Sequence, residues 1–214
     1  MPDDLVFYTH PMSRGRIVRW MLEEIGQPYR TELLEYGTTM KAPAYLAVNP
    51  MGKVPALVDG AVHLWESNAI AWYVAETHPA SRLLPETPAG RASVQRWLMF
   101  QAAHVSPASI DVYRATNERV RAFWNVSSTP DVVEAGRRAL ARYLPVLEDA
   151  LGDRPWLEGD ALTLADIAYA PHLWLLAEGG FDFVGTPRVC AWLERLLVRP
   201  AWQRTHEMLF ERGE

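Results

Sequence analysis

The spacing of hydrophobic positions divides the chain into a mixed first part and a helical remainder. Residues 5–8 form a short apolar run that a Thr-His-Pro-Met-Ser stretch ends, which is typical of a strand. Residues 14–26 then place apolar side chains at helical spacing, with Ser13 as the expected N-cap. A second strand is expected over residues 30–34. The pattern therefore predicts a strand-helix-strand unit at the start of the chain.

A hairpin and one more helix complete this first part. Residues 54–58 are apolar, an Asp-Gly pair gives a tight turn, and residues 61–65 return as the partner strand. Pro55 belongs at the first residue or the edge of its strand, because it has no N–H for a central ladder. Ser67 is the expected N-cap of the helix that follows. Residues 1–78 thus predict one α/β domain.

The remainder of the chain shows helical periodicity and no second sheet. Residues 79–90 are rich in proline and read as a linker. Beyond it, residues 91–214 predict an all-α helical-bundle domain, with helices at 91–103, 129–151, 165–176 and 187–198.

The clearest local signal of this second domain lies at Thr163 and Asp166. A threonine followed three residues later by an acidic residue is the pattern of a helix capping box. We therefore interpret Asp166 as a structural cap that serves folding and takes no part in chemistry.

Composition narrows the class of protein. The chain has 214 residues, 49% of them hydrophobic and 22% charged, which is ordinary for a soluble globular protein. The net charge of -5 without a basic stripe makes nucleic acid an unexpected partner. The longest apolar run, residues 69–75, is far shorter than the roughly 20 residues of a membrane span. The single cysteine, Cys190, excludes an internal disulfide and falls in a late helix pattern that predicts a buried, inert thiol. We expect a cytoplasmic protein.

Four motifs carry a resemblance to a known family. Residues 8–20 read Tyr-Thr-His-Pro-Met-Ser-Arg-Gly-Arg-Ile-Val-Arg-Trp, and residues 49–57 read Asn-Pro-Met-Gly-Lys-Val-Pro-Ala-Leu. Residues 64–70 read Leu-Trp-Glu-Ser-Asn-Ala-Ile, and residues 164–168 read Leu-Ala-Asp-Ile-Ala. In this order, over nearly the whole chain, they resemble the cytosolic glutathione transferases, and the general resemblance is to bacterial members. The resemblance implies a thioredoxin-like first domain with a cis proline at position 55.

The resemblance also implies where glutathione binds. Val54 would pair through its backbone with the cysteinyl part of the tripeptide, as an added strand does. Ser67, at a helix N-terminus, would take the γ-glutamyl carboxylate, and Glu66 would accept from its ammonium group. Lys53 and Lys41 are the candidates for the glycyl carboxylate.

The family activates the glutathione sulfur with a hydroxyl, for which the chain offers two candidates. Ser13 directly precedes the first helix, where its hydroxyl and the helix dipole both favour a thiolate. Tyr8 ends the first strand, which is the position of the tyrosine in tyrosine-type members. We favour Ser13 and keep Tyr8 as the alternative. His10 and Arg14 lie in the same loop as candidate donors or sources of positive potential.

The resemblance predicts a homodimeric glutathione transferase that conjugates the thiolate to small hydrophobic electrophiles and needs no metal or cofactor. Two alternatives remain: a glutathione-dependent peroxidase that uses the same residues, and a non-catalytic partner-binding protein of the same fold. Cysteine-type activities are not expected, because the first loop has no cysteine. Candidate residues of the electrophile site, chosen by position in the second domain, are Phe100, His104, Pro107 and Tyr113.

Overall fold

The computed structural model describes residues 5–124 and 128–210, and these form two compact units. The first unit runs up to Arg82 and also takes in the segment from Pro200. The second unit is Leu83–Arg199. The segment from Pro200, which the sequence pattern leads us to expect in the helical domain, therefore belongs to the first unit.

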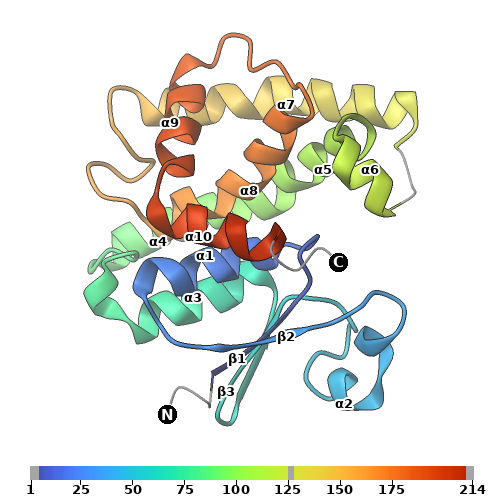
Figure 1. Cartoon of the computed structure of the whole chain (residues 1–214). Coiled ribbons are helices and arrows are strands. Elements are labelled where there is room, and N and C mark those ends of the chain that lie inside the picture. Colours follow the sequence, from blue (N-terminus) through green and yellow to red (C-terminus); the bar gives the residue numbers. More distant parts are fainter. Residues whose placement is uncertain (1–4, 125–127, 211–214) are drawn as a thin grey trace. The chain divides into compact units, whose positions relative to one another are not determined.

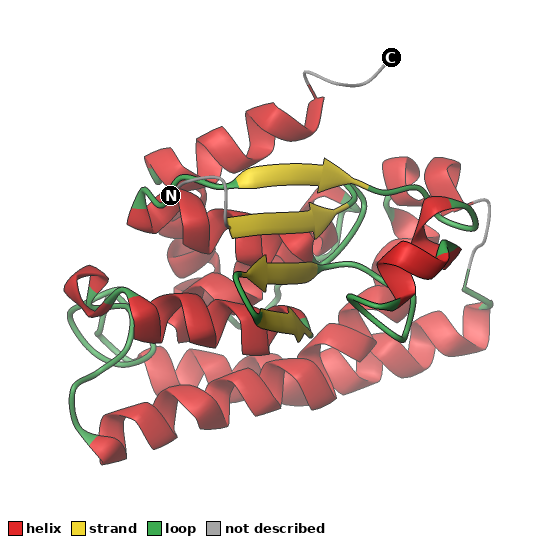
Figure 2. Cartoon of the chain, turned by 90° about the horizontal axis from the view of Figure 1, so that it is seen from below, coloured by secondary structure: helices red, strands yellow, loops and turns green. Residues whose placement is uncertain are grey.

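A four-stranded mixed sheet is the centre of the first unit. Its strands are β1 (Leu5–Thr9), β2 (Arg30–Leu33), β3 (Ala56–Asp59) and β4 (Val62–Trp65). The order across the sheet is β2-β1-β3-β4, in which β1 and β2 are parallel and the other pairs antiparallel (Figure 2). Pro55 precedes β3, so its missing N–H leaves the ladder intact. This is the thioredoxin-like arrangement that the sequence predicted.

The two faces of the sheet are covered by different segments. Phe7 of β1 is fully buried and lies beneath the guanidinium of Arg19, on the helix α1 (Gly15–Ile25). The helix α3 (Ser67–Thr77) packs beside α1 (Figure 1). On the other face, Tyr8 packs with Tyr45 of the short helix α2 (Pro43–Leu46), which a 3₁₀ turn at Thr39–Lys41 precedes. Alternation along β1 thus places the catalytic candidate Tyr8 under α2.

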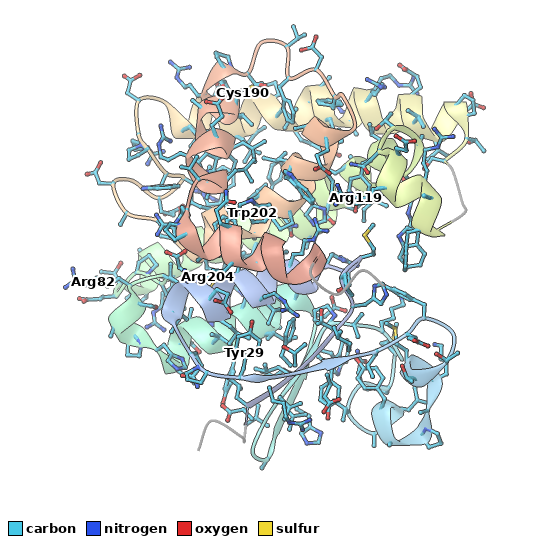
Figure 3. The ribbon with its side chains drawn as sticks, viewed as in Figure 1. Tyr29, Arg82, Arg119, Cys190, Trp202 and Arg204 are labelled. Atoms are coloured by element: carbon cyan, nitrogen blue, oxygen red, sulfur yellow. The ribbon has the colours of Figure 1, made fainter. Side chains whose placement is uncertain are left out.

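The helix α10 (Pro200–Phe210) docks on α1 and completes the first unit (Figure 1). Trp202 is 4% exposed, and its ring lies 5.1 Å from that of the fully buried Trp20. Arg204 donates to the Glu23 carboxylate at 2.9 Å, and Tyr29 donates to the same carboxylate at 2.8 Å. Figure 3 labels Trp202, Arg204 and Tyr29 in this part of the molecule.

The described residues of the second unit are helical, apart from short connections and one isolated β-bridge. The central helix is α8, which is buried along nearly its whole length because its side chains are apolar on all sides. None of the helices that the structure describes has the length and hydropathy to cross a membrane. The helices are α4 (Pro88–Phe100), α5 (Ser106–Thr116), α6 (Glu118–Trp124), α7 (Pro130–Leu151), α8 (Leu164–Glu178) and α9 (Pro187–Leu197).

The predicted capping box at the start of α8 is confirmed. The Asp166 carboxylate accepts from the N–H and the hydroxyl of Thr163, at 2.9 and 3.0 Å. It also accepts from the Leu157 N–H at 2.9 Å and from the Trp192 indole at 3.1 Å. Burial raises the pKa of Asp166, while these hydrogen bonds act to lower it. Asp166 is therefore a folding residue that joins three segments of the second unit.

Several boundaries differ from the sequence prediction. The helix expected at 91–103 begins earlier, at Pro88, and continues through a π-helical turn at Gln101–Val105 into α5. The helices α5, α6 and α10 are absent from the sequence prediction. In α4, α5 and α10 a proline lies in the first turn, where its missing N–H costs nothing. Pro200, which the sequence led us to interpret as the stop of the preceding helix, therefore starts α10.

Candidate active site

A pocket in the first unit brings together three segments that are distant in the sequence. Its lining residues come from the segment before β3, from the end of β4 with the start of α3, and from the loop after β1, which contributes one residue. The lining residues are Arg14, Asn49, Met51, Lys53, Val54, Pro55, Trp65, Glu66 and Ser67. Six of them belong to the predicted glutathione site: Arg14, Lys53, Val54, Pro55, Glu66 and Ser67. The other two predicted residues, His10 and Lys41, are not among the lining residues.

The Val54-Pro55 peptide bond is cis, as the resemblance implied. Lys53, the residue directly before this dipeptide, is held by two hydrogen bonds. The Tyr45 hydroxyl and the Asn49 amide donate to its carbonyl at 2.5 and 2.6 Å. Within the described residues, no hydrogen bond reaches the backbone N–H or C=O of Val54. The Val54 peptide edge is therefore rigid and open to pair with an extended ligand.

The N-terminus of α3 forms the opposite part of the pocket lining. The helix begins at Ser67, so its N-cap is Glu66. The sequence pattern led us to expect Ser67 as the N-cap, and the structure shifts the cap by one residue. Glu66 has φ 72° and ψ 115°, a backbone region that costs a non-glycine residue free energy and often marks a functional site. The first N–H groups of a helix favour an anion, so this corner of the pocket suits a carboxylate.

Two lysines lie near the segment before the cis proline. Lys53 is exposed and lines the pocket. A Cβ on Gly52, whose φ is +58°, would come within 2.9 Å of the Lys41 ammonium nitrogen. Because Gly52 has no side chain, the Lys41 ammonium can lie against its backbone, one residue before Lys53.

The hydroxyl of Ser13 is held in a tight loop between β1 and α1. It donates to the His10 carbonyl at 2.7 Å and accepts from the Gly15 N–H at 3.0 Å. This second bond satisfies an N–H of the first helical turn, although α1 has Arg14 as its N-cap. Ser13 is only partly buried, and its neighbour Arg14 lines the pocket, although Ser13 itself does not.

Tyr8 has a different environment from Ser13. Its ring lies 5.5 Å from that of Tyr45 and packs with Met40 and Ala56 in a small core beneath α2. Burial raises the pKa of the neighbouring Tyr45 to about 12, so Tyr45 stays a neutral donor to the Lys53 carbonyl at neutral pH. Tyr8 is half-buried and is not among the pocket-lining residues.

The four candidates for the electrophile site lie in three different environments in the second unit. Phe100 and His104 are in ring contact at 5.3 Å, and both contact Tyr143 of α7, a residue that sequence position alone did not single out. Pro107 is exposed in the first turn of α5. Tyr113 is buried and stacks on His172 of α8. The structure therefore groups Phe100 and His104 and assigns Tyr113 to the core.

Cys190 and the potential metal-ligating side chains lie outside the pocket lining or apart from one another. We expected Cys190, which lies on α9, to be buried, but the structure shows it only half-buried (Figure 3). Its pKa is raised by desolvation and by nearby carboxylates, so the thiol stays protonated at neutral pH. Among the described residues, no group of three or more His, Cys, Asp or Glu side chains is placed to hold a metal ion.

Comparisons with known proteins identify the family. The model of the "Glutathione S-transferase, N-terminal domain" matches residues 12–77, and that of the C-terminal domain matches residues 109–200. Glutathione S-transferase 3 of Zea mays is 35% identical over 209 residues, covering 94% of this chain and 92% of the relative.

Solved structures agree with this assignment. Glutathione transferase F2 of Populus trichocarpa matches with a TM-score of 0.88 and 26% identity, over 97% of this chain and 99% of that one. A family member from Pseudomonas fluorescens, solved with two glutathione molecules bound, matches with a TM-score of 0.83 and 30% identity, over 96% and 93%. The maize and poplar relatives give no support to the expected bacterial type. This chain belongs to the glutathione S-transferase family.

Proposed function

We propose that this protein is a glutathione transferase that adds the glutathione thiolate to small hydrophobic electrophiles. One observation carries the proposal: a single pocket combines the open peptide edge of Val54 with the N-terminus of α3 at Ser67. An extended peptide with a carboxylate at one end matches these two features together. The relatives named glutathione transferases support the same activity.

In the proposed complex, each charged end of glutathione meets a complementary group. The γ-glutamyl carboxylate binds the Ser67 hydroxyl and the N–H groups of α3, and Glu66 accepts from the ammonium group. The cysteinyl part pairs with the backbone of Val54. Lys53, with Lys41 beside it, neutralises the glycyl carboxylate.

Ser13 is the proposed donor to the glutathione sulfur. Its hydroxyl hydrogen bonds the His10 carbonyl when no thiolate is bound, and rotation about Cβ–Oγ redirects it to the sulfur. A hydrogen bond to an anionic sulfur is charge-assisted and therefore stronger than one to a neutral carbonyl. Tyr8 is the weaker candidate because its ring packs against Tyr45 in the small core beneath α2.

Thiolate stabilisation alone gives a modest rate gain. Lowering a thiol pKa of about 8.5 by about two units raises the thiolate fraction at pH 7 roughly 25-fold. The less basic thiolate is also a weaker nucleophile, and this lowers the rate roughly 8-fold. Holding the electrophile next to the sulfur must then supply most of the acceleration.

Binding is tested first, by calorimetry with millimolar glutathione on the purified chain and on Ser67→Ala. We expect the variant to bind glutathione about tenfold more weakly, because a hydrogen bond to a charged group is lost. Ser81→Ala is the matched control, since Ser81 donates to the His78 carbonyl outside the pocket. No binding heat from the unmodified chain would contradict the proposal and favour the non-catalytic alternative.

Catalysis is tested with aryl halide, epoxide and hydroperoxide substrates on Ser13→Ala and Tyr8→Phe. Ser13→Ala should raise the thiol pKa of bound glutathione by about two units, measured as thiolate absorbance against pH, and lower the conjugation rate at pH 7 at least about threefold. Tyr8→Phe should leave the thiol pKa in place. The opposite pattern would assign the hydroxyl to Tyr8, and hydroperoxide reduction faster than conjugation would favour the peroxidase alternative.

The remaining features of the proposal rest on the family resemblance. We expect a homodimer with a molar mass in light scattering of about twice 24.2 kDa. The proposed electrophile site uses Phe100, His104 and Pro107 of the second domain, with Tyr113 supporting them from the core. A bacterial type and a cytoplasmic location remain predictions. The same holds for the expected assignment of glutathione binding to residues 1–78, of the linker to 79–90 and of the electrophile site to 91–214.

A further inference from the structure

The loop that carries Ser13 is closed by two hydrogen bonds that both end on His10. The Ser13 hydroxyl donates to the His10 backbone carbonyl at 2.7 Å. The Met12 backbone N–H donates to Nδ1 of the His10 ring at 3.0 Å. Since a donor points at Nδ1, this nitrogen holds a lone pair, and the proton of the neutral imidazole is assigned to Nε2.

We propose that His10 is the positioning residue that sets the place of Ser13 Oγ, and that it does so as a neutral imidazole that accepts from the Met12 N–H. The inference rests on the proposed function, in which Ser13 Oγ–H donates to the glutathione sulfur. The ring fixes the backbone one residue before Ser13, and the His10 carbonyl fixes the hydroxyl itself. His10 thus acts through Ser13 and requires no contact with glutathione.

Tyr36 supports the same loop from the segment between β2 and α2. Its ring packs edge-on against the His10 ring with 4.8 Å between the centroids, and its hydroxyl donates to the Met12 carbonyl at 3.3 Å. Both peptide groups of Met12 are therefore held by side chains. Burial raises the pKa of Tyr36 to about 12, so its hydroxyl remains a donor throughout the physiological range.

Protonation of His10 would break the hydrogen bond from the Met12 N–H. An added proton on Nδ1 would point at the Met12 N–H, and two donors form no hydrogen bond. Burial lowers the pKa of His10 below its ordinary value near 6.5, whereas the Glu35 carboxylate acts to raise it. The guanidinium of Arg14, in the same loop, acts to lower the pKa of Tyr36. The Met12 bond is therefore present at neutral pH and is lost as the pH falls through the pKa of His10.

Two substitutions separate the hydrogen bond from the bulk of the ring. His10→Leu keeps an apolar group of similar size and removes the acceptor, while His10→Asn offers an oxygen at the place of Nδ1 that does not titrate. We expect His10→Leu to lower kcat about fivefold, the effect of one ordinary hydrogen bond, with the KM for glutathione nearly unchanged. His10→Asn should restore most of this loss. Equal kcat losses in both variants would overturn the proposal.

The pH profile gives a readout that a merely structural role would not move. In the unmodified protein, protonation of His10 removes the Met12 hydrogen bond, so at acid pH the conjugation rate should fall about fivefold further than the measured thiolate fraction does. In His10→Asn only the thiol titrates, and the rate should follow the thiolate fraction alone. If the rate follows the thiolate fraction in both proteins, the role of His10 is contradicted, and this comparison holds even if His10→Leu fails to fold.

A double-mutant cycle separates failure of this inference from failure of the proposed function. If His10 acts through Ser13, then His10→Leu causes no further loss of kcat in the Ser13→Ala protein. If Ser13→Ala alone keeps the full rate and thiol pKa, the assignment of Ser13 is wrong. If Ser13→Ala loses activity and His10→Leu lowers kcat equally in both backgrounds, only the role of His10 is wrong.

Discussion

Gly15 lies where the loop of Ser13 meets α1, and no side chain fits there. A Cβ at this position would lie 2.1 Å from Thr9 Oγ1 and 2.9 Å from Ser13 Oγ. We expect Gly15→Ala to lower kcat by displacing the Ser13 hydroxyl, and to destabilise the fold by about 1–3 kcal/mol. Steady-state kinetics and urea unfolding measure the two effects.

A second crowded glycine provides the control for Gly15. A Cβ on Gly136 of α7 would lie 2.9 Å from the Ala108 carbonyl, within the second unit. Gly136→Ala should lose stability in the same range and keep its kcat. Equal kcat losses in the two variants would show that the effect of Gly15→Ala is general strain rather than displacement of Ser13.

Much of the candidate site was predictable because its residues are adjacent in the sequence. The Lys53-Val54-Pro55 and Glu66-Ser67 motifs name the residues that line the pocket together. The direction of the Ser13 hydroxyl was not predictable, because it depends on a carbonyl and on a ring that only the folded loop brings to it. The left-handed backbone of Glu66 was equally hidden, since glutamate carries no signal for it.

At the scale of elements, the capping box of α8 should be the most sensitive point of the second unit. Asp166→Ala leaves four donors unpaired in the core, and we expect a loss of about 2 kcal/mol or more. Chemical unfolding measures it, and calorimetry should show unchanged glutathione affinity in the folded variant. Weaker binding without loss of stability would contradict the structural role of Asp166.

Docking of α10 should depend on an apolar contact far more than on an ion pair. Trp202 is 4% exposed against Trp20, so Trp202→Ala should cost about 3–5 kcal/mol. The Arg204 side chain is 49% exposed, and its pair with Glu23 should contribute less than about 1 kcal/mol. Urea unfolding of Trp202→Ala and Arg204→Ala compares the two, and a larger loss in Arg204→Ala would reverse the ranking.

Helix recognition from the sequence succeeded where the hydrophobic period was long and failed around proline. The helices α1, α7, α8 and α9 were predicted with small errors at their ends. Pro200 was interpreted as a stop, although proline is equally suited to the first turn of a new helix. The π-helical turn at Gln101–Val105 shifts the phase of the apolar positions, which hid the continuation into α5.

At the scale of the whole molecule, the first unit is discontinuous, since α10 follows the entire second unit in the sequence. If the second unit unfolded alone, α10 would be held on α1 by a loop on the order of 100 residues, at an entropic cost of about 4–5 kcal/mol. We therefore expect one cooperative thermal transition for both units. Glutathione at 100 times its Kd should raise the free energy of unfolding by about 2.7 kcal/mol, and the transition should move to higher temperature as one.

Calorimetry checks this expectation, together with tryptophan fluorescence, which reports on both units. Trp20 and Trp202 lie in the first unit, and Trp174 and Trp192 lie in the second. Two resolved transitions, with glutathione raising only one of them, would contradict the coupling of the units.

The position of α10 also has a consequence for biosynthesis. A ribosome makes the sheet and α1 first, but Trp20 gains its indole neighbour only when the segment from Pro200 has left the exit tunnel. The nascent sheet and α1 thus keep an uncovered hydrophobic face while the whole second unit is being translated. A premature stop codon just before position 200 would release a polypeptide with every pocket-lining residue present and that face permanently bare.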